Sequence, residues 1–241
     1  MTLQDLFDTL ATGEFTGLNL ANSVTGSIKE ESYPKIINAL NRGLRELYKR
    51  FILKKKKVYL IQQTDIARYY LQTRYIGYAS ATNAEAYLVD HPDEDFSNDV
   101  LRILEILDED DLVVELNPPH PYLNQTYFNT AGFDTLDLFT EDTGQTFLIS
   151  YQASYPKITL TETFDPEEVN LYYPPFIEEA LLNYVASLLI KGKMTKASEG
   201  EGYATNTWRY QYEQACQDII RLGLAEQTNT QDKRFNTRGF V

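Results

Sequence analysis

The sequence has almost none of the residues that cross-link a chain or bind transition metals. Cys216 is the only cysteine, which excludes an intrachain disulfide and fits folding in a reducing cytosol. The two histidines, His91 and His120, stand beside prolines in expected loops, and neither shows a metal-ligand spacing with Cys216. We therefore expect no metal, no cofactor and a fold that depends on its apolar core.

Long apolar runs and positive charge are also scarce. The longest apolar stretch, around residues 180–190, is too short and interrupted to span a bilayer, and no basic-then-apolar signal opens the chain. We therefore expect no membrane association. The 22 Lys and Arg residues face 35 Asp and Glu residues, which gives a formal net charge of −13. This balance argues against tight nucleic-acid binding, although it is compatible with a surface past which DNA slides.

Motifs of catalytic sites are missing as well. Gly200-Glu201-Gly202 lacks the third glycine and the preceding strand of a phosphate-binding loop, and no nucleophile-elbow sequence occurs. The acidic runs Asp93–Asp95 and Asp108–Asp111 offer oxygen ligands for calcium or magnesium, but neither has the spacing and glycine of an EF-hand loop. We favour solvated turns for both runs, and we expect that the protein is not an enzyme.

Apolar and aromatic residues, in contrast, are abundant. Hydrophobic residues make up 43% of the 241 residues, and aromatic residues make up 13%, including 18 Tyr. This is enough to build the core of a large domain or of a domain with an inserted module. Because tyrosine has an apolar ring and a polar tip, it suits half-buried sheet faces and contact surfaces alike. The composition indicates a β-rich core or an aromatic interface, without separating the two.

Helical periodicity marks the first part of the chain. Apolar residues repeat at helical spacing over residues 3–10, with Thr2 as the cap, and again over residues 36–51, after Pro34 in the first turn. The run Lys54–Lys57 is expected to end this second helix, where the helix dipole favours positive charge. A solvated helix end is the favoured interpretation of the run, and contact with an acidic partner or a phosphate is the alternative.

The period changes to two at Val58. Short runs of this kind predict strands at residues 58–61, 68–71, 86–89, 100–107, 112–116, 135–139 and 146–151. The acidic run at 108–111 is expected to form a hairpin turn, so that residues 112–116 pair back. Asp142 and Gly144 are expected to supply the turn between the last two strands.

Helical signals return after Pro174-Pro175. Glu178 and Glu179 lie in the expected first turn of a helix that ends near Lys191, and a last helix is expected over residues 204–222, with Gly223 as its terminator. The polar residues that follow cannot bury enough surface to fold alone.

The helical faces at the two ends of the chain each need a partner, so we expect them to pack on each other. The predicted fold class is α+β: a helical bundle from the N- and C-terminal segments with an inserted antiparallel β-rich module and a flexible C-terminal tail. The predicted domains are a helical core of residues 1–57 and 166–224, an inserted module of residues 58–165 and a C-terminal extension of residues 225–241.

Three helical segments resemble those of the head–tail adaptors of tailed bacteriophages. They are Tyr33–Phe51 (YPKIINALNRGLRELYKRF), Glu179–Ala186 (EALLNYVA) and Tyr210–Cys216 (YQYEQAC). The layout of most of residues 32–224 also resembles that family, in which two such helices hold the subunit together around a β-rich insertion of variable size.

The resemblance implies a structural virion protein at the neck of the particle, assembled from subunits that wait in the host cytoplasm. It implies a homo-oligomeric ring, usually of twelve copies, that docks on the portal protein and links it to the tail tube or nozzle protein. Double-stranded DNA would pass through this ring without specific binding. Adaptors commonly send a C-terminal extension onto the portal, so the resemblance implies portal contacts for Arg234, Phe235, Arg238, Phe240 and Val241.

Three alternatives stay open. A tail-completion or nozzle subunit of a phage tail would bind tail protein instead of the portal. A metal-dependent enzyme would depend on Asp108, Asp110 or Asp111, whose carboxylates suit hard cations. An acidic regulator that acts on the host side is the third.

Overall fold

The computed structural model describes residues 1–12, 20, 22, 26–77, 86–119, 125–140, 143–161, 163–191 and 201–226, with the backbone alone for 191 and 201–206. The chain forms two compact units, which we call the helical unit (Met1–Leu53 and Pro156–Val241) and the β-module (Lys54–Tyr155). The predicted α+β class is confirmed, since helices from both ends of the chain form one unit and the strand-rich insertion forms the other. The flexible C-terminal tail stays a prediction, because residues 227–241 lie outside the described part of the chain.

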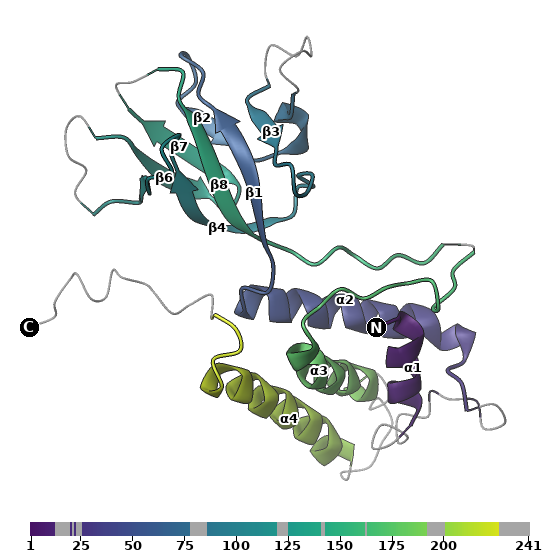
Figure 1. Cartoon of the computed structure of the whole chain (residues 1–241). Coiled ribbons are helices and arrows are strands. Elements are labelled where there is room, and N and C mark those ends of the chain that lie inside the picture. Colours follow the sequence, from purple (N-terminus) through teal and green to yellow (C-terminus); the bar gives the residue numbers. More distant parts are fainter. Residues whose placement is uncertain are drawn as a thin grey trace, which may run out of the picture. The chain divides into compact units, whose positions relative to one another are not determined.

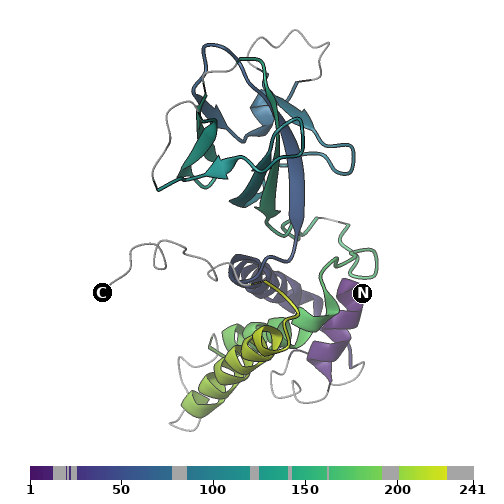
Figure 2. The same cartoon turned by 60° about the vertical axis from the view of Figure 1, so that its left-hand side comes forward.

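The helical unit contains four α-helices within the described residues: α1 (Leu3–Ala11), α2 (Tyr33–Arg50), α3 (Glu178–Lys191) and α4 (Glu201–Arg221). Short 3-10 helices precede α2 and α3, at η2 (Glu30–Ser32) and η4 (Pro175–Ile177). In both views α3 lies between α2 and α4 (Figure 1, Figure 2). The two ends of the chain therefore share one helical core, as the sequence predicts.

Helix α1 begins with the predicted cap. The Thr2 hydroxyl accepts a hydrogen bond from Asp5 N (3.2 Å), and the Asp5 carboxylate accepts one from Thr2 N (2.7 Å), which forms a reciprocal capping box. These hydrogen bonds hold the pKa of Asp5 below its usual value. Leu3 N also donates to Val169 O (2.8 Å), so α1 is tied to the segment that leads into α3.

Helix α2 buries the apolar stripe expected from its period and passes very close to α3. A Cβ atom added at Gly43 would lie 2.7 Å from Leu181 Cδ1 and 3.2 Å from Tyr184 Cδ1. The absence of a side chain at Gly43 therefore allows this close approach of α3.

The run Lys54–Lys57 does not end a helix, and that prediction was wrong. Helix α2 ends at Arg50, and Lys55 begins strand β1 (Lys55–Ile61). Lys55 and Lys57 are exposed, whereas Lys56 is buried. Four identical residues show no hydrophobic period, so the alternation of the strand was hidden in the sequence.

The β-module contains two four-stranded sheets. The first sheet has the order β3 (Leu88–Asp90), β1, β8 (Thr146–Ala153) and β4 (Val100–Leu107), and all its pairs are antiparallel. The second sheet has the order β2 (Arg68–Tyr70), β7 (Thr135–Phe139), β6 (Tyr127–Gly132) and β5 (Glu115–Leu116). Its β5 runs parallel to β6, and the short helix η3 (Thr73–Tyr75) follows β2.

The inner faces of the two sheets share one core. Phe128 of the second sheet meets Phe147 of the first edge to face, with ring centroids 4.9 Å apart. Side chains at alternate positions of the strands point inward around this pair and are almost fully buried; they include Val58, Leu60, Tyr69, Ile106, Leu136 and Ile149.

The predicted hairpins were right in part. The acidic turn exists, because Asp108 N donates to Leu112 O (3.0 Å), but the chain pairs with β4 only at Val113 before β5 joins the second sheet. Strands β7 and β8 lie in different sheets, so the segment with Gly144 connects sheets and is not a hairpin turn; Asp142 lies outside the described residues. Strand β6 had no sequence prediction.

The boundaries of the units differ from those placed by the sequence. They lie at 53/54 and 155/156, whereas the sequence places them at 57/58 and 165/166. Residues 156–165 belong to the helical unit, where Asn41 of α2 binds the backbone of Ile158. Helix α4 ends as expected, with Gly223 at a φ of +64° in the left-handed region that favours glycine.

Candidate functional site

The five residues implied as portal contacts lie outside the described part of the chain. They are Arg234, Phe235, Arg238, Phe240 and Val241. Their assignment stays a prediction.

The residues considered as metal ligands occupy unrelated places. His91 stacks on the ring of Tyr59, with centroids 5.5 Å apart, and its Nδ1 accepts a hydrogen bond from Asp93 N (3.3 Å). Cys216 is fully buried on α4, and burial raises the pKa of its thiol. His120 lies outside the described residues. Across the described ranges, no three His, Cys, Asp or Glu residues gather as a metal site would require.

The acidic run Asp108–Asp111 forms a turn that its own side chains stabilise. Asp108 Oδ1 accepts hydrogen bonds from Asp110 N (3.0 Å) and Leu112 N (2.9 Å), and Glu109 accepts one from Thr146 N (2.7 Å). Such bonds are typical of an Asx turn that stabilises a hairpin.

The second acidic run forms part of an ion-pair network around Lys56. Lys56 Nζ lies 3.0 Å from Glu94 Oε1 and 2.9 Å from Asp99 Oδ2, and Lys54 Nζ lies 2.7 Å from the same Glu94 oxygen. The Tyr151 hydroxyl donates to Asp99 Oδ1 (3.1 Å). These contacts join the loop before β4 to strands β1 and β8.

The network shifts the titration of its members. Burial disfavours the charged form of Lys56, but its hydrogen bonds to Asp99 and Glu94 outweigh this and raise its pKa. Burial acts likewise on Glu94, where the hydrogen bonds from Lys54 and Lys56 prevail and lower its pKa. Both shifts favour the charged forms of Lys56 and Glu94, and the network is a structural tie between the loop and the strands.

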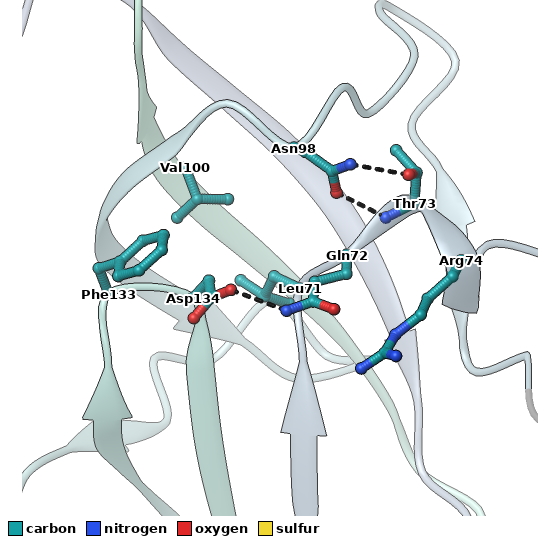
Figure 3. Close-up of a pocket in the computed structure, with 8 residues that line it drawn as sticks. All are labelled: Leu71, Gln72, Thr73, Arg74, Asn98, Val100, Phe133 and Asp134. Atoms are coloured by element: carbon teal, nitrogen blue, oxygen red, sulfur yellow. Dashed lines mark hydrogen bonds between the residues drawn. The ribbon is translucent and has the colours of Figure 1, made fainter.

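A pocket of about 380 Å³ opens on the β-module (Figure 3). It is formed by the segment after β2, the segment before β4 and the turn between β6 and β7. Its lining consists of Leu71, Gln72, Thr73, Arg74, Asn98, Val100, Phe133 and Asp134.

Hydrogen bonds fix the walls of this pocket. Asn98 Oδ1 accepts from Thr73 N (2.7 Å), and its Nδ2 donates to Thr73 Oγ1 (2.8 Å), as Figure 3 shows. Gln72 Nε2 donates to the carboxylate of Asp134 (3.1 Å). Because Phe133 is exposed, the pocket can receive an apolar side chain. Its eight lining residues include no histidine, cysteine or serine that could exchange a proton with Asp134.

In the helical unit, a charged and aromatic cluster joins α2 to α4. Arg50 Nη1 donates to Glu213 Oε2 (2.7 Å), and its guanidinium lies 6.0 Å from the ring centroid of Tyr212. Burial disfavours the charged form of Arg50, but the hydrogen bond to Glu213 outweighs it and raises the pKa. Tyr184 of α3 completes the cluster, edge to face with Tyr212 at 5.1 Å.

The outer faces of the two sheets carry apolar residues that sequence analysis did not single out. Ile61 of β1 is 39% exposed and Phe139 of β7 is 44% exposed. The ring of Phe139 stacks on that of Tyr127, with centroids 4.8 Å apart and planes 8° from parallel. These faces are the candidate interaction surfaces of the β-module.

Comparison of the chain with protein-family models and with curated proteins finds no match. In the described part of the chain, every helix is too short or too polar to cross a membrane.

Proposed function

We propose that the chain is a head–tail adaptor of a tailed bacteriophage: a structural virion subunit that docks on the portal ring and links it to the tail. One observation carries the proposal. The three segments that resemble adaptors, Tyr33–Phe51, Glu179–Ala186 and Tyr210–Cys216, coincide with α2, α3 and part of α4, and these helices pack as one unit.

The contacts between these helices support a scaffold built from both ends of the chain. Gly43 allows the close approach of α2 and α3, and Tyr184 meets Tyr212 between α3 and α4. Arg50 and Glu213, which are 163 residues apart, form a hydrogen-bonded ion pair between α2 and α4. A scaffold of this kind carries the β-module as a separate unit, the arrangement that the resemblance implies.

The charge of the chain fits passage of DNA. With a formal net charge of −13, a ring of many copies presents an excess of carboxylates, which repel phosphates at short range. Double-stranded DNA would then slide through the channel without being held. The ring, usually of twelve copies in such adaptors, would sit in the virion neck between the portal and the tail tube or nozzle protein.

The test is assembly from purified components. The full chain is mixed with the portal protein of the same genome and, separately, with its tail tube or nozzle protein, and complexes are separated by size and imaged by electron microscopy. We expect a ring of the chain bound to one end of the portal. Binding to the tail protein alone would favour the tail-completion alternative and overturn the adaptor role, as would binding to neither.

A shortened chain tests the contribution of the C-terminal extension. Removal of residues 225–241 is expected to weaken portal binding, because an extension that orders on a partner contributes contact area. The matched variant replaces only Phe235 and Phe240 with alanine and keeps the length and charge. Portal binding unchanged in both variants would refute the role of the extension and of Arg234, Phe235, Arg238, Phe240 and Val241.

A further inference from the structure

The outer face of the first sheet carries an apolar row that crosses all four strands. Tyr59 of β1 pairs with Val89 of β3 on one side and with Leu148 of β8 on the other, and Leu148 pairs with Leu107 of β4. Their neighbours along the strands are the buried core residues, so these four side chains point outward. Ile61, two residues beyond Tyr59, extends the apolar surface.

The same face is basic, against the sign of the chain as a whole. Lys55 and Lys57 are exposed on β1, and Arg102 is exposed on β4, whereas among the residues of the four strands Glu105 is the one exposed carboxylate on this face. Lys57 lies in the row next to Tyr59, paired with Ser150. An apolar row bordered by lysine is unusual in a chain with a net charge of −13.

The outer face of the second sheet is aromatic and carries an exposed carboxylate at Glu115, besides the ion pair between Arg68 and Asp137. Glu115 of β5 pairs with Tyr127 of β6, and Tyr127 pairs with Phe139 of β7, so the three side chains form one row. Glu115 is exposed beside the stacked rings of Tyr127 and Phe139. Val113, two residues before Glu115, is 68% exposed.

We propose that these two faces bind each other between copies of the chain: the apolar, basic face of the first sheet of one copy packs on the aromatic face of the second sheet of the next, with Lys57 opposite Glu115. The proposal rests on the proposed function and deepens it, because it names the contact that joins neighbouring subunits of the ring.

Two observations favour a second copy as the occupant. The faces have complementary character, with Lys57 beside an apolar row on one and Glu115 beside an aromatic row on the other. They also lie on opposite sides of one module, because the two sheets pack through their inner faces. Contact between different, opposite faces is heterologous, and repetition of such a contact builds a ring when the rotation from one copy to the next closes, as the proposed function requires.

Nucleic acid fits the first face less well. The lysines could contact phosphates, but the face also presents Val89, Leu148 and Leu107, whose aliphatic side chains gain from contact with apolar protein surface. Glu105, in the same row as Lys57, would repel a phosphate backbone.

The first experiment is cross-linking through introduced cysteines. Ser150→Cys places a thiol on the first face, and Asn129→Cys places one on the second face, beside Tyr127. A chain with both changes is treated with a bifunctional maleimide, free at high concentration and bound to its portal. We expect a ladder of covalent multimers. Each single variant, and Ser150→Cys combined with Tyr172→Cys in the helical unit, should give at most dimers; Cys216 is buried and contributes no background.

The second experiment is a charge exchange. Lys57→Glu and Glu115→Lys should each weaken self-association by about tenfold or more, and the chain with both changes should recover most of it, because the opposite charges meet again. Sedimentation equilibrium measures the association, and circular dichroism verifies the fold of each variant. Single variants that associate like the parent chain would overturn the proposal.

The outcomes separate this contact from the adaptor role. Portal binding without a ladder in either sample overturns the contact and leaves the adaptor role intact. A ladder without portal binding supports the contact and overturns the adaptor role. A nucleic-acid shift by the full chain that Lys57→Glu abolishes, without any ladder, would assign the first face to nucleic acid and overturn the contact.

Discussion

Asn41 binds the backbone of Ile158 in both directions. Its Nδ2 donates to Ile158 O (2.8 Å), and its Oδ1 accepts from Ile158 N (2.9 Å), so one side chain of α2 satisfies both backbone groups of a residue that lies outside any helix or strand. The two residues are 117 positions apart, on the two pieces of chain that the β-module separates. This pair fixes the segment after the module onto the helical unit.

Replacing Asn41 should destabilise the helical unit. Asn41→Ala leaves a partly buried N–H and C=O of Ile158 without these partners, and we expect a loss of about 1–3 kcal/mol. Urea unfolding followed by far-ultraviolet circular dichroism measures it. Asn38→Ala, on an exposed position one turn earlier in α2, is the matched control and should change stability little. Equal losses in the two variants would contradict the role of the Asn41 pair.

The variant Asn41→Asp adds a pH dependence. At neutral pH one oxygen of the new carboxylate can still accept from Ile158 N, but the other faces Ile158 O and repels it. Protonation supplies the missing donor, so the pKa of this carboxyl should be raised in the folded state. The deficit relative to the parent chain should therefore shrink as the pH falls through that raised pKa. A deficit that is constant with pH would contradict this geometry.

Adding a methyl group at Gly43 should destabilise the packing of α2 on α3. In an exposed helix Gly→Ala stabilises by about 1 kcal/mol, but here the new Cβ would lie 2.7 Å from Leu181 Cδ1 in a filled core. We expect Gly43→Ala to cost about 1 kcal/mol in the parent chain. In a chain that already carries Leu181→Ala the same change should cost clearly less, since the closest obstructing atom is gone and only Tyr184 Cδ1 remains, at 3.2 Å. A double-mutant cycle in urea measures the difference, and simple additivity would rule out the steric explanation.

Lys56 should be essential to the stability of the β-module. Its removal in Lys56→Met leaves the carboxylates of Glu94 and Asp99 without their shared cation, and we expect a loss of about 3 kcal/mol. Lys55→Met changes the neighbouring, exposed lysine and is the control. Thermal unfolding of the two variants compares them, and a smaller effect of Lys56→Met than of the control would refute the network.

The pH dependence of this network follows from Glu94. Its pKa is lowered by the hydrogen bonds from Lys54 and Lys56, so its contribution to stability is present above its ordinary value of 4.5 and is lost as the pH falls through the lower folded value. The difference in stability between the parent chain and Glu94→Gln should be largest near neutral pH and should vanish under acid conditions. A stability difference that grows as the pH falls would contradict the lowered pKa of Glu94.

The helices were predictable because their signals are local. The stripe from Ile36 to Phe51 and the cap at Thr2 depend on neighbours within two turns of the chain, and both appear in the structure. The strand at Lys55–Lys57 was missed because a run of lysines has no apolar period. The pairing of β7 and β8 with different partners depends on contacts far apart in the sequence, which turn residues alone do not specify.

The candidate surfaces were less predictable than the fold. Tyr59, Leu148 and Leu107 are ordinary outward residues of three separate strands, and they become a row only through the register that joins those strands. The stacking of Tyr127 on Phe139 likewise needs β6, which the sequence did not reveal. High tyrosine content pointed to interfaces or to a β-rich core, and the structure places tyrosines in both, with Tyr69 inside and Tyr127 outside.

The two strands through which the chain enters and leaves the β-module are hydrogen-bonded neighbours. Lys55 of β1 pairs with Gln152 of β8, and Ala153 N donates to Lys54 O (3.0 Å), so the ends of the insertion lie about one strand spacing, ~5 Å, apart. Ends this close let a whole domain be grafted into a scaffold or removed from it, with a short loop left behind. We therefore expect the module to be removable: replacing it by a tight turn between Leu53 and Pro156 should yield a small helical protein that folds without it.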